Sequence, residues 1–220
     1  LVIAPAKTSV ITYTAEEKLP EATDAGKTVG LHLNAFYAAD STQLTVTHTF
    51  DEAESVGTIT LDGEVAIIGD YAFYQTGLTS VTIPASVTEI GMSAINNCYA
   101  LQSITIPASV TTIGSSAFAY CFALASVTFE SNACQDAIGE DAFTYVGNPN
   151  PALLTLPDNW TGTKPDEDGN WYGGKFEMSS TPTTLPQMRA AVKATKVMTN
   201  GQVIFRAENK NFSVLGQEVR

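Results

Sequence analysis

The sequence contains a segment of about 23 residues that repeats almost unchanged. The string LTSVTIPASVTEIG begins at Leu78, and LQSITIPASVTTIG begins at Leu101. Repeats of roughly 20–50 residues are typical of coils that stack on one another, so the segment predicts a solenoid. A solenoid presents a long exposed surface instead of a closed pocket. The repeat therefore favours a binding function over catalysis.

Each repeat contains two short apolar patterns whose side chains are expected to face the interior of the coil. The first is L-x-x-V/I-x-I/F, as in the stretch from Leu78 to Ile83. The second is V-x-x-I-G-x-x-A-F/I, as in the stretch from Val110 to Phe118. An earlier, shorter copy begins at Val56, and the copy that begins at Leu124 carries two extra residues. Together they predict about four to five coils of 22–25 residues.

Three kinds of residue recur at fixed places in these patterns. Proline follows the first strand, where it cannot donate a backbone hydrogen bond and is expected to form the corner. Glycine follows the second strand, where we expect a backbone angle or a close approach that only glycine tolerates. A phenylalanine is expected to fill the interior of successive coils, with Ile95 interrupting the stack; these rings are Phe73, Phe118 and Phe143.

Small hydroxyl side chains occupy the outward positions of the first strand in every repeat. Because side chains alternate between the two faces of a strand, these residues are expected to form ladders across the coils. One interpretation is β propensity with hydrogen-bonded pairs between neighbouring coils. The other is a binding face that would hydrogen-bond a partner, and its candidate residues are Thr60, Ser80, Thr82, Ser103, Thr105, Ser126 and Thr128.

The composition supports a folded chain and disfavours two classes of ligand. Of the 220 residues, 44% are hydrophobic, which is enough for a sizeable core. The net charge of −12 disfavours nucleic acid and anionic membrane surfaces, since both require basic residues. No apolar stretch is long enough to span a membrane. Residue 1 is Leu, so we expect a signal or lipid anchor to have been lost from the start.

The repeated string L-x-S-V/I-T-I-P-A-S-V-T-x-I-G-x-x-A-F-x-x-C resembles the BspA-like leucine-rich repeats of bacterial, Bacteroidetes-type surface proteins. The resemblance covers Val56 to Pro157. It implies a mainly β leucine-rich-repeat solenoid with terminal caps. It also implies a secreted or cell-surface protein, in a family where adhesion to host proteins and other cells is the usual proposal. Ile95 departs from the phenylalanine usual at that position.

Changes in composition along the chain predict five parts. A solenoid needs covered ends, because open edges of stacked coils would aggregate. The Asn200-Gly201 pair predicts a hairpin turn near the C-terminus. We expect an N-terminal β cap at 1–55, leucine-rich repeats at 56–157, a C-terminal cap at 158–178, a linker at 179–187 and a small β module at 188–220.

The predicted C-terminal cap contains an aromatic cluster with two interpretations. Trp160, Trp171 and Tyr172 are expected either to plug the last coil or, if exposed, to stack on a sugar ring. The acidic turn that begins at Asp166 resembles a calcium loop, but it lacks the alternating ligands and the distal glutamate of an EF-hand. The sequence therefore predicts no metal site and no cofactor.

The remaining chemically reactive residues indicate no catalytic or metal site. Cys98 and Cys121 occupy the same place in successive repeats, where buried free thiols are expected and a disulfide is the alternative. Cys134 has no evident partner. His32 and His48 are expected to be packing or solvent-facing residues of the cap. No nucleophile elbow, zinc-protease motif or phosphate-binding loop is present, so we expect the protein not to be an enzyme.

The sequence thus predicts a non-enzymatic binding protein that uses the strand face of its solenoid. The expected partners are host or bacterial surface proteins, and glycans are an alternative. A second alternative is a structural spacer within a surface assembly that binds no ligand of its own.

Overall fold

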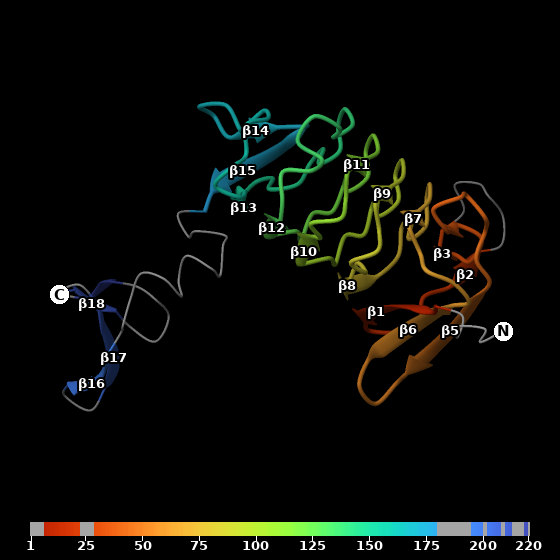
Figure 1. Ribbon diagram of the computed structural model, residues 1–220, viewed down its shortest axis with the longest axis horizontal. Coiled ribbons are helices and arrows are strands. Elements are labelled where there is room, and N and C mark those ends of the chain that lie inside the picture. The colour runs from red at the N-terminus through yellow and green to blue at the C-terminus, as the bar shows by residue number, and fades with distance from the viewer. Residues whose placement is uncertain are drawn as a thin grey trace, which may run out of the picture. The chain divides into compact units, whose positions relative to one another are not determined.

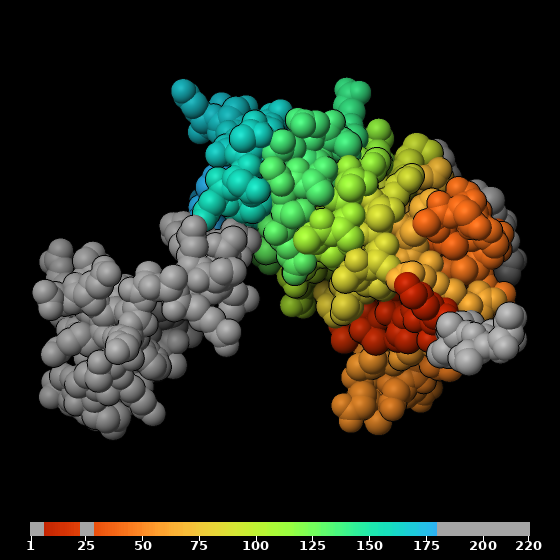
Figure 2. Space-filling view, viewed as in Figure 1, coloured from red at the N-terminus to blue at the C-terminus, as the bar shows by residue number. Residues whose placement is uncertain are grey.

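The computed structural model describes residues 7–22 and 29–179 in full, and the backbone of four short strands near the C-terminus (Figure 1). The chain divides into two compact units, residues 1–181 and 182–220. Every regular element among the described residues is a β-strand, and none of these residues forms a helix. The first unit is a β-solenoid, as the repeats predict, and successive coils appear as adjacent bands in Figure 2.

One strand of each coil follows the L-x-x-V/I-x-I/F pattern. In most of these strands, buried residues alternate with more exposed ones. In β10, for example, Ile104 and Ile106 are buried, whereas Ser103 and Thr105 are exposed. This alternation places the apolar side chains inside the coil. The five strands are β6 (Val56–Leu61), β8 (Leu78–Val81), β10 (Ser103–Ile106), β12 (Ser126–Phe129) and β13 (Ala152–Thr155).

A second, shorter strand follows a corner in each coil. Val110 N donates to Pro107 O at 3.1 Å, so the predicted proline closes the turn between the two strands. The second strands pair in parallel with one another, and Ile113 extends the ladder through a bridge to Ile138. They are β7 (Ile67–Ile68), β9 (Glu89–Ile90) and β11 (Thr112–Ile113).

The third side of each coil has no regular strand, yet its peptide groups form hydrogen-bonded columns along the solenoid. In one column each amide donates to the next coil: Phe73 N to Ala94 O at 2.7 Å, Ile95 N to Ala117 O at 2.8 Å, and Phe118 N to Ala142 O at 2.8 Å. The carbonyl of Ala94 and the amide of Ile95 belong to the same peptide group. This group therefore accepts a hydrogen bond from the preceding coil and donates one to the next coil. The peptide dipoles of the column therefore point in one direction, as they do in a helix.

This side depends on non-glycine residues in the left-handed backbone region. Each of four coils places two such residues four positions apart, with φ between 53° and 63°. The left-handed conformation costs roughly 1–2 kcal/mol for an L-residue, and the inter-coil hydrogen bonds offset this cost. The residues are Tyr71, Gln75, Ser93, Asn97, Ser116, Tyr120, Asp141 and Tyr145.

The aromatic core confirms the predicted stack and the place where it is interrupted. Phe73, Phe118 and Phe143 are fully buried. Phe118 and Phe143 stack with centroids 5.3 Å apart, whereas Ile95 lies between Phe73 and Phe118 in the sequence of coils. The stack thus runs through the C-terminal coils and is interrupted at the coil that carries Ile95.

Close packing between coils explains the glycine that follows each second strand. A Cβ atom at Gly114 would lie 2.5 Å from Met92 N and 2.6 Å from Gly91 C in the preceding coil. Backbone atoms cannot move aside as a flexible side chain can. Of the two reasons predicted for this glycine, the structure shows the close approach, since the φ angle of Gly114 is not positive.

The N-terminal strand β1 (Ser9–Ala15) lies between the first strands of the first two coils (Figure 1). It pairs antiparallel with β6 on one side and with β8 on the other. The expected ladder from Thr60 to Thr82 is therefore wrong, because a strand separates the two residues. Thr82 N instead donates to Thr12 O of β1 at 2.9 Å.

Four other short strands complete the N-terminal cap. His32 N donates to Ala72 O at 2.8 Å and thereby caps one of the peptide columns. Phe36 is buried and packs edge-on against Phe73, with centroids 5.8 Å apart. The strands are β2 (Glu21–Ala22), β3 (Leu31–His32), β4 (Phe36–Tyr37), which pairs with β7, and β5 (Val46–Asp51), which pairs with β6.

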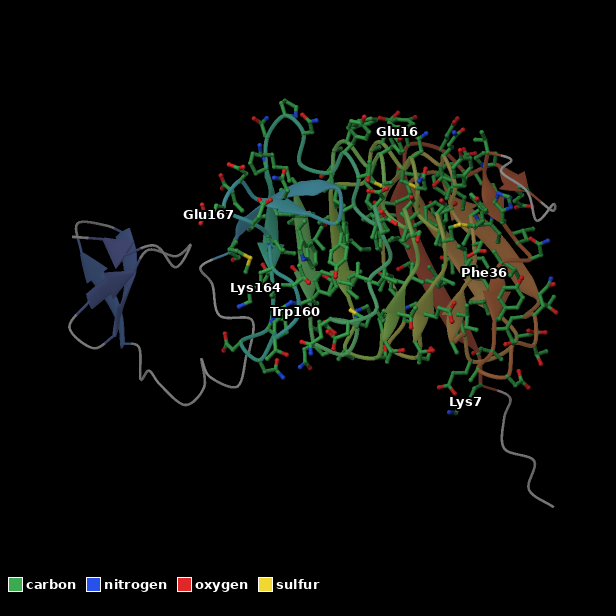
Figure 3. The ribbon with its side chains drawn as sticks, turned by 90° about the horizontal axis from the view of Figure 1, so that it is seen from above. Lys7, Glu16, Phe36, Trp160, Lys164 and Glu167 are labelled. Carbon is green, nitrogen blue, oxygen red and sulfur yellow. The ribbon has the colours of Figure 1, made fainter. Side chains whose placement is uncertain are left out.

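The C-terminal cap closes the other end of the first unit with β14 (Asn170–Trp171) and β15 (Gly174–Met178). Strand β15 pairs in parallel with β13 and antiparallel with β14. Phe143 N donates to Tyr172 O at 3.0 Å, which ends the peptide column that begins at His32. Phe36 and Trp160 lie near opposite ends of the solenoid (Figure 3).

The second unit contains one antiparallel sheet with the strand order β16-β17-β18-β19. Thr199 pairs with Gln202, and the predicted turn at Asn200-Gly201 lies outside the described residues. Most of the expected linker at 179–187 lies outside the described residues. The strands are β16 (Thr195–Thr199), β17 (Gln202–Ala207), β18 (Lys210–Phe212) and β19 (Glu218–Val219).

Candidate interaction surface

The outer face of β10, β12 and β13 carries hydroxyl ladders in the predicted register. Ser103 pairs with Ser126, and Thr105 pairs with Thr128. Thr128 in turn pairs with Thr155. These five residues, which we call the strand face, carry no charge, and parallel pairing places like side chains one strand apart. The result is a flat, neutral array of hydroxyl groups.

The serine ladder ends one coil before the threonine ladder. Ser126 pairs with Leu153 of β13, which is 44% exposed, and Leu153 pairs with Glu177 of β15. The strand face is therefore bordered by an exposed apolar residue at its C-terminal end. Sequence alignment of the repeats did not indicate Leu153, because the fifth coil is only partly formed.

The other three predicted binding residues lie in the sheet that contains β1. Ser80 Oγ and Thr14 Oγ1 are 2.7 Å apart, so the Ser80 hydroxyl is already hydrogen-bonded within the protein. Thr60 pairs with Val10 of β1, and both Thr60 and Thr82 are exposed. The candidate residues therefore form two groups instead of one continuous ladder.

Four exposed aromatic residues follow the edge where the coils turn into their first strands. Tyr120 and Phe122 flank the buried Cys121, and Tyr99 follows the buried Cys98 at the same place in the preceding repeat. Tyr99 is 60% exposed and Phe122 is 54% exposed. Exposed aromatic side chains are enriched at protein interfaces because they bury large apolar areas on binding. We call Tyr99, Tyr120, Phe122 and Tyr145 the aromatic edge.

The aromatic edge was not among the residues predicted from the sequence. The sequence feature that could have indicated it is the alternation around Cys121. If the thiol of Cys121 points into the core, the side chains on either side of it point outward. Three of the rings touch one another. Tyr120 lies 5.0 Å from Tyr145 and 6.2 Å from Phe122, measured between ring centroids. These three rings form a connected patch, and Tyr99 is the exposed ring of the preceding repeat.

The two tryptophans of the predicted glycan site are part of the core. Trp160 and Trp171 are each 3% exposed, and both indole nitrogens donate to Thr163 O, at 3.1 and 2.9 Å. Trp171 stacks on Phe143 with centroids 5.5 Å apart. These rings plug the last coil, so their faces are not available to a sugar. Tyr172 is half-buried beside Trp171.

The carboxylate of Asp166 is hydrogen-bonded by groups of its own acidic turn. Asp166 Oδ1 accepts hydrogen bonds from Asp168 N at 3.0 Å and from Asn170 N at 2.8 Å. The side chain of Asn170 also donates to this carboxylate. Its hydrogen bond is the largest cause of the lowered pKa of Asp166, and the backbone hydrogen bonds lower the pKa further. Among the described residues, no group of three or more potential metal ligands comes together.

A chain of hydrogen-bonded side chains connects three strands of the N-terminal cap. The side chain of His48 is 1% exposed; its Nε2 lies 2.7 Å from Tyr13 Oη and its Nδ1 lies 2.8 Å from Glu21 Oε1. A carboxylate can only accept, so Nδ1 donates to Glu21 and Nε2 accepts from the tyrosine hydroxyl. Burial lowers the pKa of His48 and raises the pKa of Tyr13. His48 is thus a packing residue, one of the two roles expected for it.

The three cysteines are buried free thiols. Cys98 Sγ donates to Phe73 O at 3.0 Å, and Cys121 Sγ donates to Ile95 O at 3.1 Å, so each thiol bonds to the preceding coil. Burial raises the pKa of Cys121, and it raises the pKa of Cys134 to about 11. The first of the two interpretations, buried thiols instead of a disulfide, agrees with this arrangement.

Comparison with known families now identifies the repeats. The model of the family described as "BspA type Leucine rich repeat region" matches residues 33–159 in six copies. The chain belongs to this family. The match begins upstream of Val56, within the segment expected to form the N-terminal cap. BspA-type repeats are a scaffold family, and membership suggests a role in protein interaction.

The comparisons go no further than the family. No curated protein and no solved structure matches the chain significantly. In the part of this BspA-type chain that the structure describes, no helix is long and apolar enough to cross a membrane.

Proposed function

We propose that this BspA-type solenoid is a non-enzymatic adhesion protein, secreted or held at the cell surface, that binds extracellular proteins of a host or of other cells. The observation that carries the proposal is the strand face with the aromatic edge beside it. A neutral field of hydroxyls adjoins exposed rings that are 40–60% accessible. Protein interfaces commonly combine aromatic anchors with a core that is depleted of charge.

The charge distribution supports a protein partner over a polyanion. No lysine or arginine occurs from Gly57 to Gly147, the segment that contains most of the strand face and all of the aromatic edge. A surface without basic residues gains no electrostatic attraction from phosphate or sulfate groups. Hydroxyl donors and aromatic rings instead suit the amide groups and apolar side chains of another protein.

The test is a binding screen of the whole chain against immobilised extracellular-matrix proteins and intact cell surfaces. Saturable binding to at least one protein is the expected result. Because a spacer binds nothing, absence of binding to every surface would replace the adhesion proposal with the structural alternative.

A further inference from the structure

A cavity of about 480 Å³ lies where the last coil meets the C-terminal cap. This volume falls within the range of about 300–1,000 Å³ that is typical of small-molecule sites. The cavity is separate from the strand face, because none of the five residues of the strand face lines it. Its main lining residues are Asp141, Thr144, Tyr145, Asn148, Gly173 and Lys175.

The column of equivalent positions that contains Tyr145 ends at the cap in a glycine that also lines the cavity. Four residues occupy equivalent positions in successive coils, because the backbone amide of each donates to the following coil. They are Gln75, Asn97, Tyr120 and Tyr145. Tyr145 N donates to Gly173 O at 3.3 Å, so the next position in the column is Gly174. Gly174 carries no side chain, and a Cβ there would meet Phe143 O and Phe176 Cε2, each at 2.7 Å, so the chain at this position packs against the core.

Tyr145 lines the cavity. Tyr120 stacks against Tyr145 with ring centroids 5.0 Å apart and planes 29° apart. The cavity is lined by Tyr145 and not by Tyr120. Tyr145 is 47% exposed, and it therefore offers one ring face to a ligand.

Polar groups of different kinds surround the ring. Asp141 and Lys175 are exposed, and neither forms an ion pair within 4.0 Å with another described residue. Asn148 contributes an amide that both donates and accepts. Thr144 Oγ1 is buried and has no hydrogen-bond partner among the described residues. The site thus combines an acceptor, a donor and a group that does both next to an aromatic face.

We propose that this cavity binds a neutral sugar ring. A pyranose has an apolar C–H face that packs on an aromatic ring, and its hydroxyls donate and accept at the rim. Stacking on Tyr145 would bring those hydroxyls to Asp141, Asn148 and Lys175. A purely apolar ligand would leave the two charged groups of the rim unpaired, and a polyanion would meet Asp141 on a chain with a net charge of −12.

The experiment is saturation-transfer NMR on the whole chain with methyl β-galactopyranoside, methyl α-mannopyranoside and N-acetylglucosamine. Transfer to at least one of these sugars is the expected result. Tyr145→Ala removes the ring and abolishes the transfer, whereas Tyr145→Phe keeps the ring and retains it. Tyr99→Ala is the matched control, because Tyr99 is an exposed tyrosine of the same edge that lies outside this cavity.

A second variant keeps the test valid if Tyr145→Ala unfolds, which circular dichroism would reveal. Asp141→Asn replaces an exposed carboxylate by a group of equal size, and it weakens sugar binding severalfold without altering the melting curve. No transfer to any of the three sugars overturns the inference, as does transfer that persists unchanged in both variants. Sugar binding is independent of the strand face, so it persists in a chain whose strand face carries lysine substitutions.

Discussion

Phe118 and Phe143 stack almost parallel inside the solenoid, with their ring centroids 5.3 Å apart and their planes only 5° apart. Trp171 continues the stack at 5.5 Å from Phe143. The repeat places a phenylalanine at the same position in two consecutive coils, and the cap stacks a tryptophan against the second of these rings. The C-terminal cap thus continues the core of the repeats instead of forming a separate core.

Removing a ring from the middle of this stack should be costly. Phe118→Ala is expected to lower the free energy of unfolding by about 3–5 kcal/mol, because it removes buried apolar area and leaves a cavity. Urea unfolding measures the change. Phe122→Ala is the control: this ring is 54% exposed, and its removal should cost less than about 1 kcal/mol. A cost for Phe118→Ala below about 1 kcal/mol would show that the ring is not in the core.

The glycines differ in a way that thermal unfolding can test. At Gly114 a Cβ atom would meet backbone atoms at 2.5–2.8 Å, whereas at Gly77 it would meet only Tyr99 Oη, at 3.8 Å. Gly114→Ala is expected to destabilise the protein by about 1–3 kcal/mol or more, since the coils must separate. Gly77→Ala should be neutral or slightly stabilising, by up to about 1 kcal/mol. Equal effects of the two changes would refute the close packing of the coils.

The buried His48 should make the protein less stable in mild acid. Burial lowers its pKa below the ordinary value of 6.5, so between these two values the unfolded chain binds more protons than the folded chain. The free energy of unfolding therefore falls as the pH drops through 6.5 towards the lowered pKa. Tyr13 and Glu21, the two side chains that contact His48, do not titrate within this interval, because the pKa of Tyr13 is raised above 10.0 and the pKa of Glu21 is lowered below 4.5.

The measurement for His48 compares melting temperatures at about pH 7.5 and about pH 5.5 for the wild type and for His48→Gln. The wild type should lose more stability than the variant over this interval, because glutamine does not titrate. Only the difference between the two pH values matters, so a general loss of stability in the variant does not affect the test. The same loss in both proteins would mean that His48 does not titrate as the structure indicates.

The thiols should be unreactive in the folded protein. All three are buried, and the thiolate that reacts with Ellman's reagent is rare at Cys134, whose pKa is about 11. The folded chain is expected to show negligible labelling at neutral pH, and the chain in urea without reductant should show three thiols. A count of one in urea would reveal a disulfide between two of the three cysteines.

The sequence was sufficient to predict the fold where the repeat is regular. Two consecutive copies fixed the spacing of coils, the buried phenylalanines and the register that pairs Thr105 with Thr128. It was not sufficient where the chain leaves the repeat. Strand β1 enters the sheet between β6 and β8, and such a long-range antiparallel insertion has no periodic signal.

The candidate site was predictable only in part for a related reason. The hydroxyl ladders follow from strand alternation, but the aromatic edge depends on residues in the left-handed region, such as Tyr120 and Tyr145. Tyrosine has no particular preference for that backbone conformation, so the inter-coil hydrogen bonds impose it. The burial of Trp160 and Trp171 likewise depends on how the cap folds over the last coil.

The central claim is that the strand side of the solenoid is the binding surface. The most direct test compares affinities for a bound extracellular protein after lysine is placed on two different sides of the solenoid. Thr105→Lys/Thr128→Lys alters the strand face, and Thr112→Lys/Ser115→Lys alters exposed residues on or beside β11. We expect the first variant to lose binding and the second to retain it. Retained binding in the first variant with loss in the second would contradict this claim.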